Sequence, residues 1–258
     1  MVYYVVSDVH GFYSETEYAL DNAGFFEERL PHTLIVCGDF FDRGKEAIKM
    51  QEFICDLMRK NQIILVRGNH EDLALDLLDT FSENLDVYSV PRHHFSNGTF
   101  DTFMQLAKMS LSDVMLDPEK LVKRVEKTPF FTRIIPESLN YFETKNFVFV
   151  HGWIPYVPRS FERSYAEADW RNATAAEWRD ARWINGMNAY FSGAVLPDKT
   201  IVCGHYHTSY GHSRADGTAE FGDDADFSTF AEDGIIAIDA CTAFSKRVNV
   251  LRIDDDDI

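Results

Sequence analysis

Cysteine, basic charge and long apolar runs are all scarce in this chain of 258 residues. The four cysteines lie far apart, which argues against a disulfide framework and against a paired-cysteine zinc site. No run approaches the roughly 18 apolar residues of a membrane-spanning helix, and Met1–Val6 lacks the pattern of a secretion signal. We therefore expect a cytoplasmic protein with no membrane contact. We expect buried free thiols at Cys37, Cys55, Cys203 and Cys241.

Basic residues are strongly outnumbered. The chain has 25 Lys and Arg against 42 Asp and Glu, a net charge of −17. A protein that holds nucleic-acid backbones needs a broad basic face, so this balance argues against stable nucleic-acid binding. Any attraction for a phosphate must be local, and a pair of bound divalent cations would reverse the field where it matters. We interpret Asp254–Asp257 as a solvated tail.

Short β-branched apolar runs alternate with helix-like stretches in the first third of the chain. The runs at 3–7, 33–37 and 62–66 each precede a polar or glycine-containing turn, and apolar positions recur at helical spacing between Gly44 and Lys60. This pattern predicts a mainly parallel sheet. The carboxyl ends of its strands meet at one edge, where ligands of open α/β sheets usually bind.

The pattern changes after this first unit. Residues 81–136 are polar and aromatic with weak periodicity, and we expect a largely helical insertion over the edge that carries the site. Strand patterns then resume and predict a second sheet layer, with a hairpin formed by its first two strands. These strands are expected at 141–144, 147–150, 199–203, 234–240 and 248–253, and the acidic stretch 214–233 is expected to be a loop. The expected fold is therefore one α/β domain, residues 1–258, with two sheets and flanking helices.

Metal-binding residue types follow the predicted strands. Carboxylate, imidazole and amide donors suit hard to borderline divalent ions, and strand ends deliver them to one edge from distant positions. Asp39 has two oxygens and can bridge two ions about 3.5 to 4 Å apart. The clusters are Asp8-Val9-His10-Gly11, Gly38-Asp39-Phe40-Phe41-Asp42-Arg43-Gly44, Gly68-Asn69-His70-Glu71, His151-Gly152 and Gly204-His205-Tyr206-His207. If residues 8–10 are extended, Asp8 and His10 share one face and chelate one ion.

In this order, the clusters resemble those of the calcineurin-like metallophosphoesterases, and specifically the phosphoprotein phosphatase family with its bacterial and phage members. That family's pattern is G-D-x-H-G, G-D-x-x-D-R-G, G-N-H-E, H-G and G-H. The resemblance covers the whole metal core but not the insertion, and it implies a four-layer αββα fold. Arg43 and Glu71 favour the phosphatase family, whereas Ser7 departs from its usual glycine.

The resemblance also implies a division of labour in the site. His70 would protonate the leaving oxygen, Asp42 would orient His70, and Arg43 would hold the phosphoryl oxygens as a bidentate fork, with Asn69 also on the phosphate. The nucleophile would be a hydroxide that bridges the two metals. The implied ligands are Asp8, His10 and Asp39 for the first metal, and Asp39, Asn69, His151 and His205 for the second.

Two further residues are assigned with an alternative beside each. His207 stands two residues after His205, where generic metallophosphoesterases have another ligand to the first metal; the alternative is an outward-facing histidine. The family also places a second arginine on the phosphate. Arg182, beside Trp183, is our choice, and an ordinary surface charge is the alternative.

The expected activity is a two-metal phosphomonoesterase of the serine/threonine protein phosphatase type, acting on a phosphorylated protein or a small phosphoester. Manganese is the favoured metal, with iron or zinc as alternatives. A symmetrical dinucleoside tetraphosphatase is a second interpretation, because an aromatic insertion offers a surface for a base. A non-catalytic metal-binding module is a third. Retention of His70, Asp42 and Arg43 argues against the third, because a scaffold has no chemical need of them.

Overall fold

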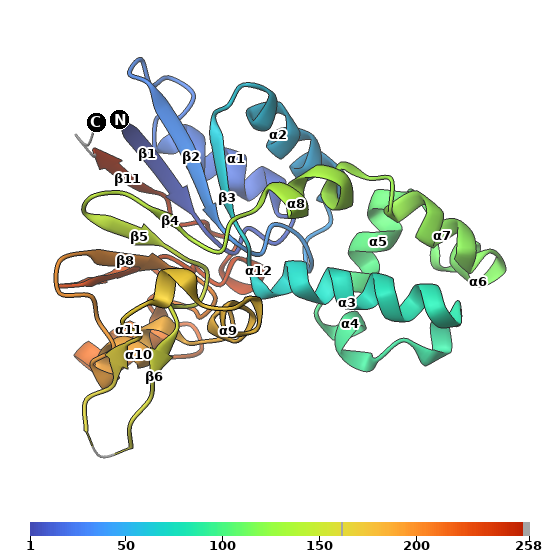
Figure 1. The fold of residues 1–258 in the computed structure, drawn as a ribbon. Helices are drawn as coiled ribbons and strands as arrows, with labels where there is room; N and C mark the ends of the chain where they lie inside the picture. The colour runs from blue at the N-terminus through green and yellow to red at the C-terminus, as the bar shows by residue number, and fades with distance from the viewer. Residues whose placement is uncertain (161, 255–258) are drawn as a thin grey trace.

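Two mixed sheets packed face to face form the centre of the molecule (Figure 1). The computed structural model describes residues 1–160 and 162–254. The first sheet has the order β11-β1-β2-β3, with β1, β2 and β3 parallel and β11 antiparallel to β1. Its strands are β1 (Val2–Val6), β2 (His32–Cys37), β3 (Ile63–Val66) and β11 (Leu251–Asp254).

The second sheet has the order β4-β5-β8-β10-β9. Its three central strands are parallel, and antiparallel strands β4 and β9 close the two edges. The strands are β4 (Phe142–Glu143), β5 (Phe147–Phe149), β8 (Thr200–Cys203), β9 (Phe230–Glu232) and β10 (Ile235–Ala237). In both sheets the parallel strands end on the same side, which brings their following loops together.

Alternating side chains hold the two sheets together. Val5, Ile35 and Val66 of the first sheet are buried with Phe149 and Val202 of the second, in a core that lies between the sheets. The other face of each strand packs outward against helices, so the central strands are apolar on both faces. This two-sided burial explains why the strands read as continuous apolar runs in the sequence.

Helices cover the outer face of each sheet, which confirms the predicted α/β sandwich. Next to the first sheet lie α1 (Tyr13–Asn22) and α2 (Ala47–Arg59). Near the second lie a 3₁₀ turn (Trp170–Asn172), α9 (Ala175–Ala181), α10 (Gly186–Ser192) and α11 (Ser209–Asp216), with the small hairpin β6 (Tyr156–Val157) and β7 (Tyr165–Ala166). The short α12 (Thr242–Ser245) lies between β10 and β11 in the chain.

The helical insertion stands to one side of the sandwich in Figure 1. The 16-residue helix α3 leads from the sheet edge into it, and is twice as long as the stretch from Glu71 to Leu78 that reads as helical in the sequence. Because α3 ends at Asn84, the insertion begins within a helix rather than after one. Its elements are the C-terminal end of α3 (Asn69–Asn84), a 3₁₀ turn (Val87–Ser89), α4 (Arg92–Ser96), α5 (Thr99–Ala107), α6 (Leu111–Leu116), α7 (Pro118–Val125), a π-helical turn (Phe130–Ile134) and α8 (Ile135–Glu137).

The structure corrects two details of the predicted fold. The last strand, β11, was expected in the second sheet but pairs with β1 of the first, in a register of Val2 with Asp254. Alternating burial identifies a strand but does not say which sheet edge it joins. The acidic stretch 214–233, expected as a loop, also contains the end of α11 and all of β9. The predicted hairpin at β4 and β5 is confirmed.

The structure also bears on the cysteines, on membrane-spanning helices and on the acidic tail. All four cysteines are free, and three are buried; Cys241 is the exception, being half-buried. In residues 1–160 and 162–254, no helix is both long enough and apolar enough to cross a membrane. Of the acidic tail, 255–257 lies outside the described residues, so its interpretation stays a prediction.

Candidate dinuclear metal centre

The loops that follow five parallel strands converge at one edge of the sandwich. Asp8, His10, Asp39 and His205 all have positive φ angles, from 47° to 67°. Non-glycine residues rarely adopt this left-handed conformation, and clusters of them mark functional loops. The sequence argument assumed that residues 8–10 are extended, and the structure shows that they are not. A left-handed turn brings Asp8 and His10 to the same side instead.

Two glycines allow these loops to approach one another. A Cβ atom on Gly68 would lie 2.2 Å from Oδ1 of Asp39, and one on Gly204 would lie 2.2 Å from Oδ2 of Asp8. Any side chain at these positions would displace a carboxylate of the centre. The glycines beside Asn69 and His205 are thus required by close packing.

Asp39 lies in the middle of the centre, and its two oxygens face different groups. Oδ2 is 3.7 Å from Nε2 of His10, and Oδ1 is 3.4 Å from Nε2 of His151. Asp8 belongs to the first group, because its Oδ1 is 4.0 Å from Nε2 of His10. This is the arrangement that a carboxylate shared between two cations requires.

The second group gathers around Asn69. Its Oδ1 lies 2.8 Å from Nε2 of His151 and 2.9 Å from Nδ1 of His205. Three donor atoms from α3 and from the ends of β5 and β8 therefore converge within bonding distance. The structure thus brings together all six predicted core ligands: Asp8, His10, Asp39, Asn69, His151 and His205.

The far nitrogens of two histidines are already engaged. Nδ1 of His10 donates to the carbonyl of Phe41 at 2.9 Å, and Nδ1 of His151 donates to the carbonyl of Cys37 at 2.8 Å. These bonds fix the tautomer so that the lone pair on Nε2 faces the centre, which is how metal-binding histidines are oriented. The donor set and its orientation fit two divalent ions.

The electrostatics of the centre favour cations. Burial alone would raise the pKa of Asp39, but the neighbouring imidazoles, with His151 and His70 first among them, hold that pKa below its ordinary value. Burial lowers the pKa of His10 well below its usual range and that of His205 to about 3, so both rings are neutral at pH 7 and keep a lone pair for a metal.

His70 and Asp42 form a buried pair beside the ligands. Nδ1 of His70 donates to Oδ2 of Asp42 at 2.7 Å. Burial lowers the pKa of His70, but Asp39 and the hydrogen bond to Asp42 outweigh it and raise that pKa to about 9. At neutral pH the ring therefore holds a second proton, on Nε2, which is the one available to a leaving group.

Arg43 reaches into the same space. Its Nη1 donates to Nε2 of His10 at 2.9 Å, and its Nη2 lies 3.2 Å from Nε2 of His70. A metal ion would take the lone pair on Nε2 of His10, and Nε2 of His70 carries the proton described above. The guanidinium is then free to turn its fork to a phosphoryl group.

The insertion supplies two threonines that no pattern in the sequence selects. Oγ1 of Thr99 donates to Oδ2 of Asp42 at 2.7 Å, and Oγ1 of Thr102 accepts from the backbone N–H of Asp42 at 3.0 Å. Both come from the first turn of α5. Their spacing of three puts them on one helix face, but this pattern is common on helices and does not identify a partner.

Glu71 links two of the loops through hydrogen bonds to their backbones. It is fully buried and accepts hydrogen bonds from the backbone N–H groups of Gly68 at 2.7 Å and of Asp39 and Phe40 at 3.0 Å each. Burial and the nearby Asp39 raise the pKa of Glu71 to about 7. In the sequence, this residue was only a family marker; in the structure, it joins the loops after β2 and β3.

Asp239 is a buried carboxylate that the sequence motifs missed. It follows β10, and its Oδ1 accepts from the backbone N–H of Cys241 at 2.7 Å. Burial and the charge of Asp8 raise the pKa of Asp239 well above its usual range. The rule that selected the other loops, an acidic residue directly after an apolar run, could have found it.

Two predicted site residues are not brought into the centre. Nδ1 of His207 is 2.7 Å from Oγ of Ser209, and its ring stacks on Tyr206. Arg182 is buried and donates to Asp72 at 2.7 Å and to Asn140 at 2.6 Å. His207 as a ligand and Arg182 as a phosphate contact stay predictions that this geometry does not favour.

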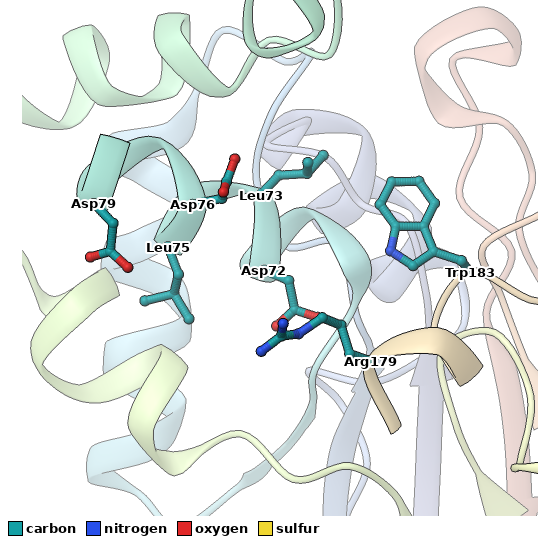
Figure 2. Close-up of a pocket in the computed structure, with 7 residues that line it drawn as sticks. All are labelled: Asp72, Leu73, Leu75, Asp76, Asp79, Arg179 and Trp183. Atoms are coloured by element: carbon teal, nitrogen blue, oxygen red, sulfur yellow. The ribbon is translucent and has the colours of Figure 1, made fainter. Parts of the chain in front are cut away.

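A groove of about 420 Å³ adjoins the centre (Figure 2). Trp183 connects the two, because its ring contacts that of His205 at a centroid distance of 5.9 Å while 51% of the residue is exposed. Figure 2 shows the α3 side chains on one wall and Arg179 and Trp183 on the other. The lining residues are Asp72, Leu73, Leu75, Asp76, Asp79, Arg179 and Trp183.

A two-sheet sandwich that gathers two ligand sets around one aspartate suits two-metal phosphoester chemistry. Comparison with protein families agrees: residues 1–223 match the calcineurin-like phosphoesterases. The chain belongs to this family. The family uses a dinuclear metal centre, and the ligand groups described above are present for it.

Curated relatives match over short segments. The chain is 39% identical over 72 residues to a symmetrical bis(5'-nucleosyl)-tetraphosphatase of Wigglesworthia glossinidia brevipalpis, which is 28% of this chain and 25% of that protein. It is 33% identical over 82 residues to serine/threonine-protein phosphatase 2 of Escherichia coli, which is 32% of this chain and 35% of that one. The matches therefore span about a third or less of each relative.

Solved structures match over the whole chain but with low identity. A cold-active protein-tyrosine phosphatase of a psychrophilic Shewanella has a TM-score of 0.52 at 15% identity, covering 98% of this chain and 75% of that one. Its I115M mutant gives 0.54 at 14%, with the same coverage. These similarities support the fold.

Proposed function

We propose that the chain is a two-metal phosphomonoesterase of the serine/threonine protein phosphatase type. The observation that carries this proposal is the position of the buried His70–Asp42 pair beside an aspartate whose two oxygens face two ligand sets. A general acid held next to two cation sites is what hydrolysis of a phosphoester with a poor leaving group requires.

Each ligand set would hold one metal ion. Asp8, His10 and Asp39 would hold one divalent ion, and Asn69, His151 and His205 would share Asp39 with the second. Two such ions supply Lewis-acid polarisation of the phosphoryl group and an acidified water as nucleophile. Mixed oxygen and nitrogen donors without thiolate suit manganese, the ion we favour, with iron or zinc as alternatives.

The chain's own residues then have distinct tasks. Arg43 binds the phosphoryl oxygens, and the side-chain amide of Asn69 can donate a further hydrogen bond to them. His70 donates the proton on Nε2 to the leaving oxygen while Asp42 holds the ring through Nδ1. The general acid accounts for about 10² to 10⁴ of the rate.

The groove supports a phosphoprotein over a polyphosphate as substrate. Asp76 and Asp79 are exposed on its α3 wall, and Arg179 is the one basic residue among the described residues that line it. Two charges 4 Å apart in water interact by about 1 kcal/mol. A chain of four phosphates would be repelled along this wall, whereas a basic side chain near a phosphorylated residue would be attracted.

A symmetrical dinucleoside tetraphosphatase is the second candidate. The half-exposed indole of Trp183 beside His205 favours it, because an aromatic face is a surface on which a base can stack. Relatives of both kinds match the chain.

A substrate panel tests the proposal. Protein loaded with manganese is assayed on phosphoserine and phosphothreonine peptides, p-nitrophenyl phosphate and diadenosine tetraphosphate, with His70→Asn as the control for catalysis at this site. We expect peptide turnover that His70→Asn reduces. Turnover of the tetraphosphate alone would establish the second candidate. No turnover of any substrate would leave a metal-binding module.

A further inference from the structure

A second group of metal-binding side chains lies in the insertion. Asp76 comes from α3, and His93 and His94 come from α4. One ligand atom from each lies within 4.8 Å of the other two. The group shares no residue with the dinuclear centre, and no motif in the sequence selects it.

His94 is the unusual member. It has no exposed surface, and Nε2 lies 3.1 Å from Oδ2 of Asp76, which is itself half exposed. Nδ1 is buried and has no hydrogen-bond partner among the described residues. Burying a polar ring with one of its nitrogens unpaired costs free energy, so the arrangement is not explained by packing.

The state of the ring suits metal binding. Burial and the neighbouring His93 lower the pKa of His94, so the imidazole is neutral and keeps a lone pair. His93 is exposed and its ring lies 4.1 Å from that of His94, centroid to centroid, which places a second imidazole at the same spot.

We propose that Asp76, His93 and His94 bind a third divalent transition-metal ion. Two imidazoles and one carboxylate suit zinc, cobalt or nickel, and water can complete the coordination on the exposed side. Binding through Nε2 of His94 moves the ring proton to Nδ1, and the shared ion replaces the hydrogen bond from Nε2 to Asp76.

The location gives such an ion a structural effect on the catalytic pair. It would fix α4 to α3, and α4 leads directly into Gly98 and Thr99 at the start of α5. Thr99 donates to Asp42, and a Cβ on Gly98 would lie 2.4 Å from the backbone nitrogen of Arg43. The proposed ion therefore stabilises the segment that holds Asp42 and Arg43 in place.

Metal content tests the proposal independently of activity. Wild type and the double variant Asp76→Asn/His93→Ala are saturated with zinc, dialysed against buffer, and measured by elemental analysis. Asp79→Asn is the matched control, since it removes the same charge from the same helix outside the group. We expect the double variant to hold one equivalent less than both wild type and Asp79→Asn, whatever the occupancy of the dinuclear centre.

Cobalt gives a second readout. Cobalt titration followed by visible absorption should show one class of site in wild type that the double variant lacks. Circular dichroism confirms that the variants are folded. Equal zinc content and equal cobalt titrations in all three proteins would overturn the proposal and leave His94 as a histidine that is hydrogen-bonded to Asp76 alone.

Discussion

The strand-end loops of the sandwich and the helices of the insertion both reach the metal centre, but they contribute different kinds of group. The loops, together with the first turn of α3, supply the charged and imidazole ligands and the acid His70. The insertion supplies neutral hydroxyls, from Thr99 and Thr102, that contact Asp42. Loop residues therefore act on the substrate, whereas insertion residues act through other residues.

This difference predicts a gradient of mutational effects, steepest at the shared ligand. Asp39→Asn removes a charge that faces both ligand sets. Metal assistance is worth several kcal/mol, so we expect activity to fall by about 10³-fold or more. Metal content by elemental analysis should fall with it. Asp56→Asn, at a half-exposed position on α2, is the control and should change neither. Full activity in Asp39→Asn would remove the shared-ligand assignment.

Replacement of His70 should separate chemistry from metal binding. His70→Asn removes the proton donor, and we expect kcat on a phosphoserine peptide to fall by about 10² to 10⁴. The loss should be smaller for p-nitrophenyl phosphate, because its leaving group needs no proton. Metal content should equal that of wild type. An equal loss on both substrates would contradict the general-acid role.

How far the sequence predicts the molecule depends on the region. The ligands could be found because Asp39, Asn69 and His205 each follow a readable apolar strand, and parallel strands end at one edge. The sheet that β11 joins could not be predicted from the sequence, because strand pairing is set by tertiary contacts. The contact of Thr99 with Asp42 could not be predicted either, because a threonine in a helix gives no sign of what it contacts.

The same contrast applies to the buried carboxylates. Glu71 was visible as part of a motif, but its three backbone bonds depend on how two loops meet in space. His207 shows the opposite case, a motif residue whose role stays a prediction. A motif placed it at the metal, whereas the turn after His205 carries its ring toward Tyr206 and Ser209.

Glu71 lies beside the loops but is expected to contribute to stability rather than to catalysis. Glu71→Gln replaces one acceptor oxygen with an N–H₂ group, which opposes a backbone N–H. An unsatisfied buried donor costs about 1 to 3 kcal/mol, so we expect stability to fall by that amount. Urea denaturation of the metal-free protein measures it, with exposed Glu52→Gln as the control. Unchanged stability would mean that the two loops hold together without this carboxylate.

Thr99 tests whether the insertion acts through Asp42. Thr99→Val removes a hydroxyl bonded to a buried carboxylate. Loss of such a bond costs about 1 kcal/mol, which corresponds to about a fivefold fall in kcat. Because Asp42 sets the protonation of His70, the pH profile of kcat should shift while KM stays constant; Thr80→Val, outside this contact, is the control. A fall in kcat without a shifted profile would point to packing alone.

The smallest expected effect lies in the groove, where loop and insertion meet. Asp79 is exposed on α3, so solvent and salt screen its attraction for a basic side chain of the peptide, which is worth well under about 1 kcal/mol. Asp79→Asn should raise KM about two- to threefold for phosphopeptides with a basic residue near the phosphoserine, and leave KM unchanged for peptides with a neutral residue there. High salt should abolish the difference, because screening removes a purely electrostatic preference. If the variant instead lowers KM for every peptide equally, the wall repels the phosphoryl group itself, and substrate choice comes from Trp183 rather than from charge.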